Sequence, residues 1–188
     1  MPQAKTFTTK ELRRALDYVA THKHAPRNRV MILITHLAGM RVGEVAMLRF
    51  GDVVEKDGTI RTEIRLEAEQ TKGNKSRIVF VNERLRKEIA GYVASMPLPT
   101  LDTPMFYTQK RTAFTPNTLC QTMNTIYKGA GLHGATSHSG RRTFITTLAA
   151  KGVGVRVLAA LAGHRSISTT QAYIDVNDEM KRAAVELI

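Results

Sequence analysis

A histidine and an arginine stand three residues apart in the segment SHSGRRTF, a spacing suited to holding a phosphate. On a helix, His138 and Arg141 would lie one turn apart on the same face, with Arg142 about 100° away from Arg141. A guanidinium group can donate to two phosphate oxygens at once, and an imidazole can move a proton near neutral pH. The alternative interpretation of this pair is a solvated helix N-terminus with an incidental histidine.

A second histidine and a tyrosine occur towards the end of the chain, in LAGHRSISTTQAYI. His164 follows a glycine that is typical of a helix end, and Tyr173 comes nine residues later. We expect Ser168 to cap the short helix that carries the tyrosine. Most tyrosines are core residues with a hydrated hydroxyl, and a phenol becomes a good nucleophile only where a cationic site stabilises the phenolate.

Composition favours a polyanionic partner. The 188 residues include 28 lysines and arginines against 16 aspartates and glutamates, a formal net charge of +12. A hydrophobic content of 43% can supply a core, and the single cysteine, Cys120, excludes an internal disulfide framework and a cysteine-based zinc site. No apolar run approaches the roughly 20 residues of a membrane span, and no secretion signal opens the chain. We therefore expect a basic cytoplasmic protein, associated with the nucleoid.

Helical periodicity dominates the chain. Apolar spacing predicts a first helix over 10–22, capped by Thr8 or Thr9, and a second over 28–37, with Pro26 as the interruption between them. A short helix over 42–48 follows, and Asn82 is expected to cap another. Further helices are predicted at 116–129, 138–151, 154–162 and 168–174, with a last one from about 177 to the end.

One stretch between these helices has the period of a strand. In TIRTEIRLE, alternate residues from Ile60 to Leu66 share one face, and turns at 56–58 and 72–75 flank them. The segment RIVFV, starting at Arg77, is the returning strand of a small three-strand sheet. The predicted fold is therefore mainly α with a small antiparallel β-sheet, in a single domain spanning 1–188.

Four motifs together carry a family resemblance. GMRVGEVAMLRFGDV, a hairpin with QTKGNKSRIVFV, then SHSGRRTF and LAGHRSISTTQAY follow one another between Gly39 and Tyr173. In this order they resemble the catalytic domain of tyrosine recombinases, the phage integrase family. The resemblance implies that family's fold and the breaking and rejoining of DNA strands through a phosphotyrosyl intermediate.

The resemblance implies catalytic roles for six residues, which are Arg41, Lys72, His138, Arg141, His164 and Tyr173. Tyr173 would be the nucleophile, Lys72 the proton donor to the leaving 5′-oxygen, and His138 the base near the tyrosine proton. His164 would donate a hydrogen bond to the phosphate. Glu44, three residues after the first arginine, is expected to brace an arginine or to cap a backbone amide. Lys75 lies on the same turn as Lys72 and is the alternative catalytic lysine.

Two arginines can neutralise the charge that develops on the non-bridging oxygens of a five-coordinate phosphorus without help from a metal. The sequence contains no carboxylate cluster and no Cys/His spacing typical of a metal site, so we expect neither a metal nor a cofactor. Additional contacts to DNA are expected from Lys75, Arg77, Arg142 and Arg165.

The expected partner is double-stranded DNA, with self-association into a tetramer on the DNA. Family members usually carry an amino-terminal domain that closes a clamp around the duplex, and only about 38 residues precede the first arginine motif here, so we expect that domain to be absent. Residues 177–188 carry an apolar stripe, formed by Met180, Ala183, Ala184, Leu187 and Ile188. This tail either docks on a neighbouring protomer or packs on its own domain.

The sequence favours a site-specific recombinase that serves a phage or another mobile element. One alternative is a relaxing enzyme like the type IB topoisomerases, which shares the chemistry. Another is a non-catalytic DNA-binding regulator with the same fold, and a third is a basic RNA- or ribosome-binding domain. The complete set of six residues argues against the regulator, and the ordered motifs argue against the RNA-binding domain.

Overall fold

The computed structural model describes residues 4–71, 73–97, 99–174 and 178–186, apart from the side chains of 179, 180 and 183. Its first helix, α1 (Thr9–Ala20), begins with a capping box. The Glu11 amide donates to Thr8 Oγ1 at 3.2 Å, and the Thr8 amide donates back to the Glu11 carboxylate at 3.0 Å. Helix α2 (Ala25–Leu37) begins three residues earlier than predicted. Pro26 lies in its first turn, where a missing N–H costs nothing, and so does not interrupt it.

The sheet has two strands within the described residues, and the prediction of three is wrong. Strand β1 (Glu63–Leu66) pairs antiparallel with β2 (Arg77–Phe80). Two short helices precede them, α3 (Val42–Met47) and α4 (Phe50–Val53), and a 3₁₀ turn, η1 (Ala68–Gln70), follows β1. Residues 50–53, just before the turn at 56–58, form the helix α4, and Val54 after it forms only an isolated bridge with Ile60.

The regular structure after the sheet is helical in the described residues, which confirms the mainly α fold class with a small antiparallel sheet. They are α5 (Glu83–Val93), α6 (Pro116–Gly129), α7 (Ser139–Ala150), α8 (Val155–Ala162), α9 (Ile167–Gln171) and α10 (Asp178–Val185). Asn82 caps α5, accepting from the Leu85 amide at 2.9 Å, as predicted. Helix α9 is capped by Ser166 rather than Ser168 and ends at Gln171, so Tyr173 lies just beyond the helix. No helix in the described part of the chain is long and apolar enough to cross a membrane.

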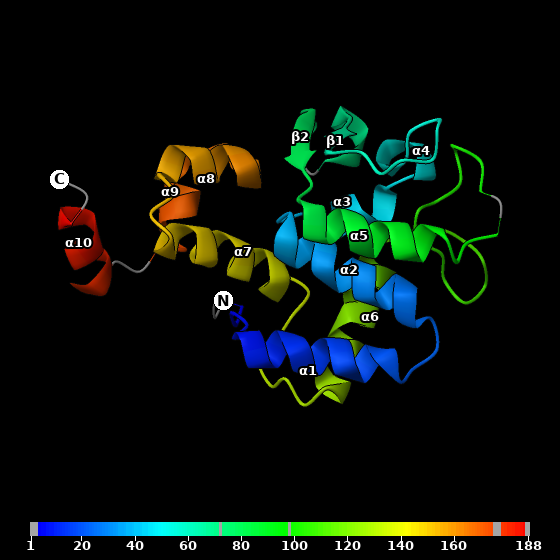
Figure 1. Ribbon diagram of the computed structural model, residues 1–188, viewed down its shortest axis with the longest axis horizontal. Helices are drawn as coiled ribbons and strands as arrows, with labels where there is room; N and C mark the ends of the chain where they lie inside the picture. The colour runs from blue at the N-terminus through cyan, green and yellow to red at the C-terminus, as the bar shows by residue number, and fades with distance from the viewer. Residues whose placement is uncertain (1–3, 72, 98, 175–177, 187–188) are drawn as a thin grey trace.

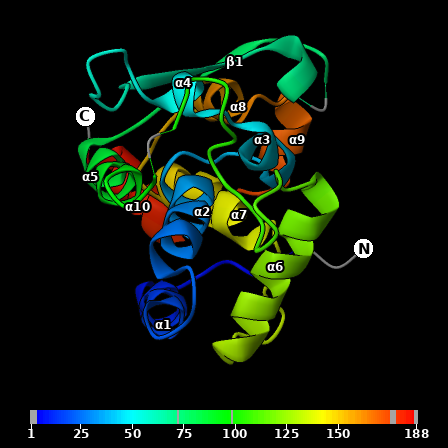
Figure 2. The same cartoon turned by 90° about the vertical axis from the view of Figure 1, so that its right-hand side faces the viewer.

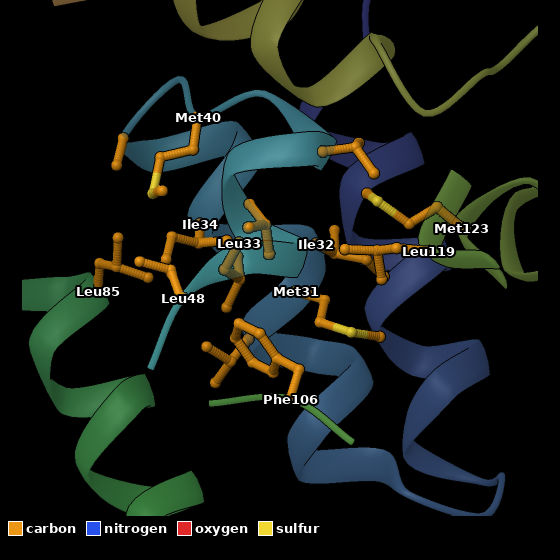
Figure 3. Close-up of a cluster of buried hydrophobic side chains, with 14 of the residues drawn as sticks. Met31, Ile32, Leu33, Ile34, Met40, Leu48, Leu85, Phe106, Leu119 and Met123 are labelled. Atoms are coloured by element: carbon orange, nitrogen blue, oxygen red, sulfur yellow. The ribbon is translucent and has the colours of Figure 1, made fainter. Parts of the chain in front are cut away.

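The elements form layers around α2. Figure 2 shows α2 and α7 in the middle, with β1, α4 and α8 on one side and α1 and α6 on the other. The α2 run from Met31 to Ile34 is almost completely buried. Figure 3 shows these side chains gathered with Leu48, Leu85 and Phe106 from the surrounding elements. This core includes Val42, Val45 and Ala46 of α3, and α7 packs against α2. Helices α3 and α7 carry the arginine motifs at their N-termini.

Helix α10 lies at one end of the molecule, beyond α7 and α9 (Figure 1). Its Val185 is exposed, as is Ala184 from the predicted apolar stripe. Leu187 and Ile188 lie outside the described residues, as do the side chains of Met180 and Ala183. Docking of the tail on a neighbouring protomer therefore stays a prediction.

The contact between α2 and α7 depends on a glycine. A Cβ on Gly140 would collide with Thr35 Oγ1 and approach the His36 amide nitrogen to 3.3 Å. We expect Gly140→Ala to lower the free energy of unfolding by about 2 kcal/mol through overpacking. Gly91→Ala is the matched control, because no atom lies within 4 Å of its Cβ position, and it should stabilise by about 0.5 kcal/mol. Urea unfolding of both variants tests this, and equal stabilities would contradict the close packing.

Candidate active site

A buried carboxylate organises the first part of the site. Glu44, on α3 and 1% exposed, accepts hydrogen bonds from two arginines. Arg41 Nη1 donates to its Oε1 at 2.9 Å, and Arg77 Nη2 donates to its Oε2 at 2.7 Å. Burial alone would raise the pKa of Glu44, but the hydrogen bond and charge of Arg77, helped by Arg41, bring it below its ordinary value. The carboxylate therefore stays ionised and holds both guanidinium groups.

Arg141 enters the same region from the first turn of α7 and is 6% exposed. Its Nη1 donates to the Gly39 carbonyl at 2.6 Å, and its Nη2 donates to the Ala162 carbonyl at 2.5 Å. Burial lowers the pKa of Arg141, and the positive charge of Arg41 adds to this effect. A guanidinium group nevertheless keeps its charge in proteins, so Arg141 is a fixed cation with further N–H groups left to donate.

Two glycines with positive φ supply main-chain carbonyls to these arginines. Gly39 has φ 63°, and a Cβ there would reach within 2.7 Å of Phe144 Cε1. Gly163 ends α8 with φ 62°, and its carbonyl accepts from Arg41 Nη2 at 2.9 Å. A Cβ on Gly163 would lie 2.7 Å from Arg77 Cδ. Both positions therefore need glycine for the backbone and for the space beside it.

His164 and Tyr173 lie together beside the arginines. Their rings stack with centroids 5.8 Å apart and planes 20° apart. His164 Nδ1 lies 2.8 Å from the hydroxyl of Thr170, a fully buried residue. Burial lowers the pKa of His164 to about 4, and the charges of Arg141, Arg41 and Arg77 act in the same direction. The imidazole is therefore neutral at physiological pH and carries a single N–H.

Arg142 contacts the tyrosine from α7. Its guanidinium carbon lies 5.7 Å from the centroid of the Tyr173 ring, a cation–π geometry. Its Nε is buried and has no hydrogen-bond partner among the described residues. Arg142 and His164 thus both contact the ring of Tyr173, which lies just after the end of α9.

An open pocket of about 720 Å³ lies beside Arg41 and Arg77, and neither Arg141 nor Tyr173 is among the residues that line it. Arg41, Arg77 and His164 line it, and Lys75 and Arg165 contribute from the rim. An N–H of Arg165 donates to the carbonyl of Gly73, which ties the turn before α9 to the turn between β1 and β2. Lys72 lies outside the described residues, so its place relative to the pocket stays a prediction. The exposed Lys75, the alternative catalytic lysine, lines this pocket.

His138 lies at a second, adjoining pocket of about 400 Å³. It is exposed and precedes the first residue of α7, and Arg41 and Glu44 line the same pocket. Arg41 borders both pockets. The structure therefore places His138 and His164 at two pockets that share this arginine.

The charges of the cluster suit a phosphate. Arg41 and Arg77 pair with the carboxylate of Glu44, and Arg141, held by main-chain carbonyls, feels the same charges. Three guanidinium groups with one carboxylate leave an excess of two positive charges. Their protein partners hold them in place before any ligand arrives, and preorganised donors of this kind stabilise charge that develops during a reaction. A neutral histidine and a tyrosine lie beside them. The arrangement can bind an anionic tetrahedral group, and the ring of Tyr173 is stacked on the neighbouring His164.

Replacement of the buried carboxylate should be costly. In Glu44→Gln the amide group would face guanidinium donors and leave the nearly buried Arg77 without its counter-ion. We expect a loss of about 3 kcal/mol in the free energy of unfolding, measured with urea. Glu88→Gln, which breaks a more exposed pair with Arg29, is the matched control and should cost no more than about 1 kcal/mol. Equal losses would show that Glu44 is not the organising group.

Several parts of the site were not predicted. The carbonyls of Gly39 and Gly163 hold Arg141 and Arg41, and Thr170 contacts His164. In the sequence, the glycines themselves indicate a positive φ, but they do not indicate that their carbonyls accept hydrogen bonds from arginines. Thr170 stands three residues before Tyr173 in a polar run, with no periodicity that marks it as buried.

Comparison with known proteins shows the family of the chain. The model of the phage integrase family matches residues 5–180, and the chain belongs to that family. It is 27% identical over 186 residues to the tyrosine recombinase XerA of Pyrococcus furiosus, an alignment that covers 97% of this chain and 61% of that protein. The chain thus spans about three fifths of the length of this relative.

Solved structures show the same fold. A crystal structure of XerA recombinase superposes with a TM-score of 0.77 at 26% identity, covering 100% of this chain and 66% of that one. A structure of XerH site-specific recombinase bound to a palindromic difH substrate, in a post-cleavage complex, gives a TM-score of 0.69 at 25% identity, covering 96% and 51%. The family resemblance inferred from the four motifs is therefore confirmed.

Proposed function

We propose that the chain is the catalytic domain of a site-specific DNA recombinase that cleaves and rejoins strands through a 3′-phosphotyrosyl intermediate. The observation that carries the proposal is the stacked pair of Tyr173 and His164 beside the fixed guanidinium groups of Arg41 and Arg141. A nucleophile next to a preformed site for a tetrahedral anion is what phosphodiester cleavage requires.

The first step is a transesterification. The Tyr173 oxygen attacks the phosphorus, the bond to the 5′-oxygen breaks, and the 3′-phosphate remains linked to the tyrosine. Arg41 and Arg141 neutralise the charge on the non-bridging oxygens, and His164 donates a hydrogen bond to one of them. His138 takes the phenol proton, and Lys72, with Lys75 as the alternative, returns a proton to the 5′-oxygen. Attack by a 5′-hydroxyl reverses these steps and rejoins the strand.

The proposed partner is double-stranded DNA, bound mainly through phosphate contacts. Lys75, Arg77, Arg142 and Arg165 are the proposed additional contacts, and Lys75 and Arg165 stand at the rim of the pocket. The net charge of +12 supports this partner. The structural relative XerH was crystallised bound to a difH substrate, which also supports it. We place the activity in the cytoplasm at the nucleoid, as a tetramer on DNA that serves a phage or another mobile element.

Duplex binding by this chain should depend strongly on salt. We expect steep weakening between about 0.05 and 0.2 M salt, because each neutralised phosphate releases counterions on binding. Fluorescence anisotropy with a labelled duplex at graded salt concentrations measures the slope. A tight complex that persists at about 0.5 M salt would contradict binding dominated by phosphate contacts.

A nicked duplex tests the proposed chemistry directly. Because the target site is unknown, a pool of random-sequence duplexes with a nick next to the randomised segment is incubated with the chain, without divalent metal. We expect a covalent protein–DNA band on a denaturing gel that retains a label at the 5′ end of the cleaved strand. Retention of a label at the 3′ end instead would contradict a 3′-phosphotyrosyl link.

The other interpretations predict different outcomes. A relaxing enzyme like the type IB topoisomerases would form the band and also relax a supercoiled plasmid as a monomer, without paired sites. A DNA-binding regulator would bind the duplex and form no band. Absence of the band, both from this chain and from the chain fused to an amino-terminal clamp domain, would contradict the proposed function.

A further inference from the structure

A buried threonine contacts the histidine of the site. Thr170, in the last turn of α9, is 0% exposed, and its Oγ1 lies 2.8 Å from His164 Nδ1. A hydroxyl can donate or accept in such a contact. The direction of this hydrogen bond decides which ring nitrogen of His164 carries the proton.

The other ring nitrogen, Nε2, is on the far side of the imidazole from Nδ1. His164 lines the 720 Å³ pocket together with Arg41 and Arg77, while Thr170 is buried away from solvent. With Nδ1 committed to the threonine, Nε2 is the nitrogen available to a ligand in this pocket. A neutral imidazole can donate there only if its single proton is on Nε2.

We propose that Thr170 is a positioning residue whose hydroxyl donates to Nδ1 of His164 and so holds the imidazole as the Nε2–H tautomer, aimed at the anion in the pocket. This inference rests on the proposed function for the identity of that anion, a DNA phosphate. The hydrogen bond made by one ring nitrogen sets the protonation of the other. The reverse direction would place a lone pair of Nε2 against the phosphate and weaken binding of the transition state.

The fixed tautomer also explains why a neutral histidine suits this place. Burial and the neighbouring guanidinium groups lower the pKa of His164 and keep it uncharged. It therefore acts as a hydrogen-bond donor and not as a proton donor. The stacked ring of Tyr173 is held on the same imidazole, so a rotation of His164 would also disturb the nucleophile.

Nitrogen-15 NMR of the imidazole groups tests the tautomer without any DNA. The chain has six histidines, and the signal of His164 is identified by its absence from His164→Asn. At pH 7.5 we expect the wild type to show His164 with the proton on Nε2. Thr170→Val, which keeps the shape and removes the hydroxyl, should give a mixture of tautomers, and Thr170→Ser should restore the wild-type spectrum.

Thr143→Val is the matched control, because Thr143 is another buried threonine with a hydrogen-bonded hydroxyl, on α7. It should leave the tautomer of His164 unchanged. A proton found mainly on Nδ1 in the wild type would overturn the inference, as would an unchanged His164 tautomer in a folded Thr170→Val. Thr170→Ser keeps the test decisive if the valine variant unfolds, since a serine that fails to give the Nε2–H tautomer would also overturn it.

A rate measurement connects the tautomer to catalysis. We expect Thr170→Val to slow covalent-complex formation on the nicked duplex by about tenfold, the typical consequence of losing one hydrogen bond in a site, with duplex binding unchanged. Thr170→Ser should recover the rate, and in His164→Asn the valine substitution should have no further effect. If no covalent complex forms, either with this chain or with the chain fused to an amino-terminal clamp domain, the proposed function fails while the NMR result still decides the role of Thr170.

Discussion

Tyr173→Phe should abolish the covalent protein–DNA complex and leave duplex binding nearly unchanged. The substitution removes one oxygen, the atom that would attack the phosphorus. It keeps the aromatic ring that stacks on His164 and lies under Arg142. Fold and DNA contacts should therefore be retained while the chemistry is lost. The measurement compares covalent band intensity on the denaturing gel with anisotropy of the same labelled duplex.

Tyr107→Phe is the matched control for this prediction. Tyr107 lines a different pocket from that of Arg41 and His164, and its main-chain carbonyl accepts from Arg27. Removal of the Tyr107 hydroxyl in this variant should leave the covalent band at the wild-type level. If Tyr173→Phe still formed the band, another residue would be the nucleophile and the assignment of Tyr173 would be wrong.

Arg141→Lys should slow covalent-complex formation by about 10²–10³-fold, the usual effect of removing one preorganised donor from such a site. A lysine keeps the charge but lacks the planar set of N–H donors of an arginine. It therefore cannot donate to the carbonyls of Gly39 and Ala162 and, at the same time, to a phosphate. The loss should therefore appear in the single-turnover cleavage rate at saturating DNA, with a smaller change in affinity.

The exposed Arg165 provides the comparison. Arg165→Lys keeps a cation at the rim of the pocket, and we expect its cleavage rate to stay close to that of the wild type. The loss of a preorganised donor should slow cleavage by far more than about twofold. If the cleavage rate of Arg141→Lys were within about twofold of that of Arg165→Lys, charge alone would suffice and the planar guanidinium of Arg141 would have no special role.

Local signals in the sequence were enough to predict the helices and the family. The cap residues Thr8 and Asn82 and the change of period near Ile64 depend on interactions within a few residues of the chain. The prediction failed where a distant or competing contact decides. Residues 50–53 form the helix α4 with only an isolated bridge after it, and Pro26 enters a helix because its first turn tolerates proline.

The candidate site could be predicted as a set of residues but not as a structure. Arg77 was expected only to contact DNA, yet it pairs with the buried Glu44, which lies 33 residues earlier in the chain and also pairs with Arg41. The carbonyl of Gly163 reaches Arg41 across 122 residues. Such contacts form only when the core brings α3, β2 and α8 together, and no periodicity in one sequence records them.

Identification of the nucleotide-linked peptide would show which residue attacks the DNA. After reaction with the nicked duplex, nuclease trimming and trypsin digestion, mass spectrometry locates the residue that carries the nucleotide. Cleavage after Arg165 and Lys181 releases a peptide whose one tyrosine is Tyr173. We predict the adduct on this peptide, on the tyrosine, through a 3′-phosphate. An adduct on any other peptide, or through a 5′-phosphate, would contradict the proposed mechanism.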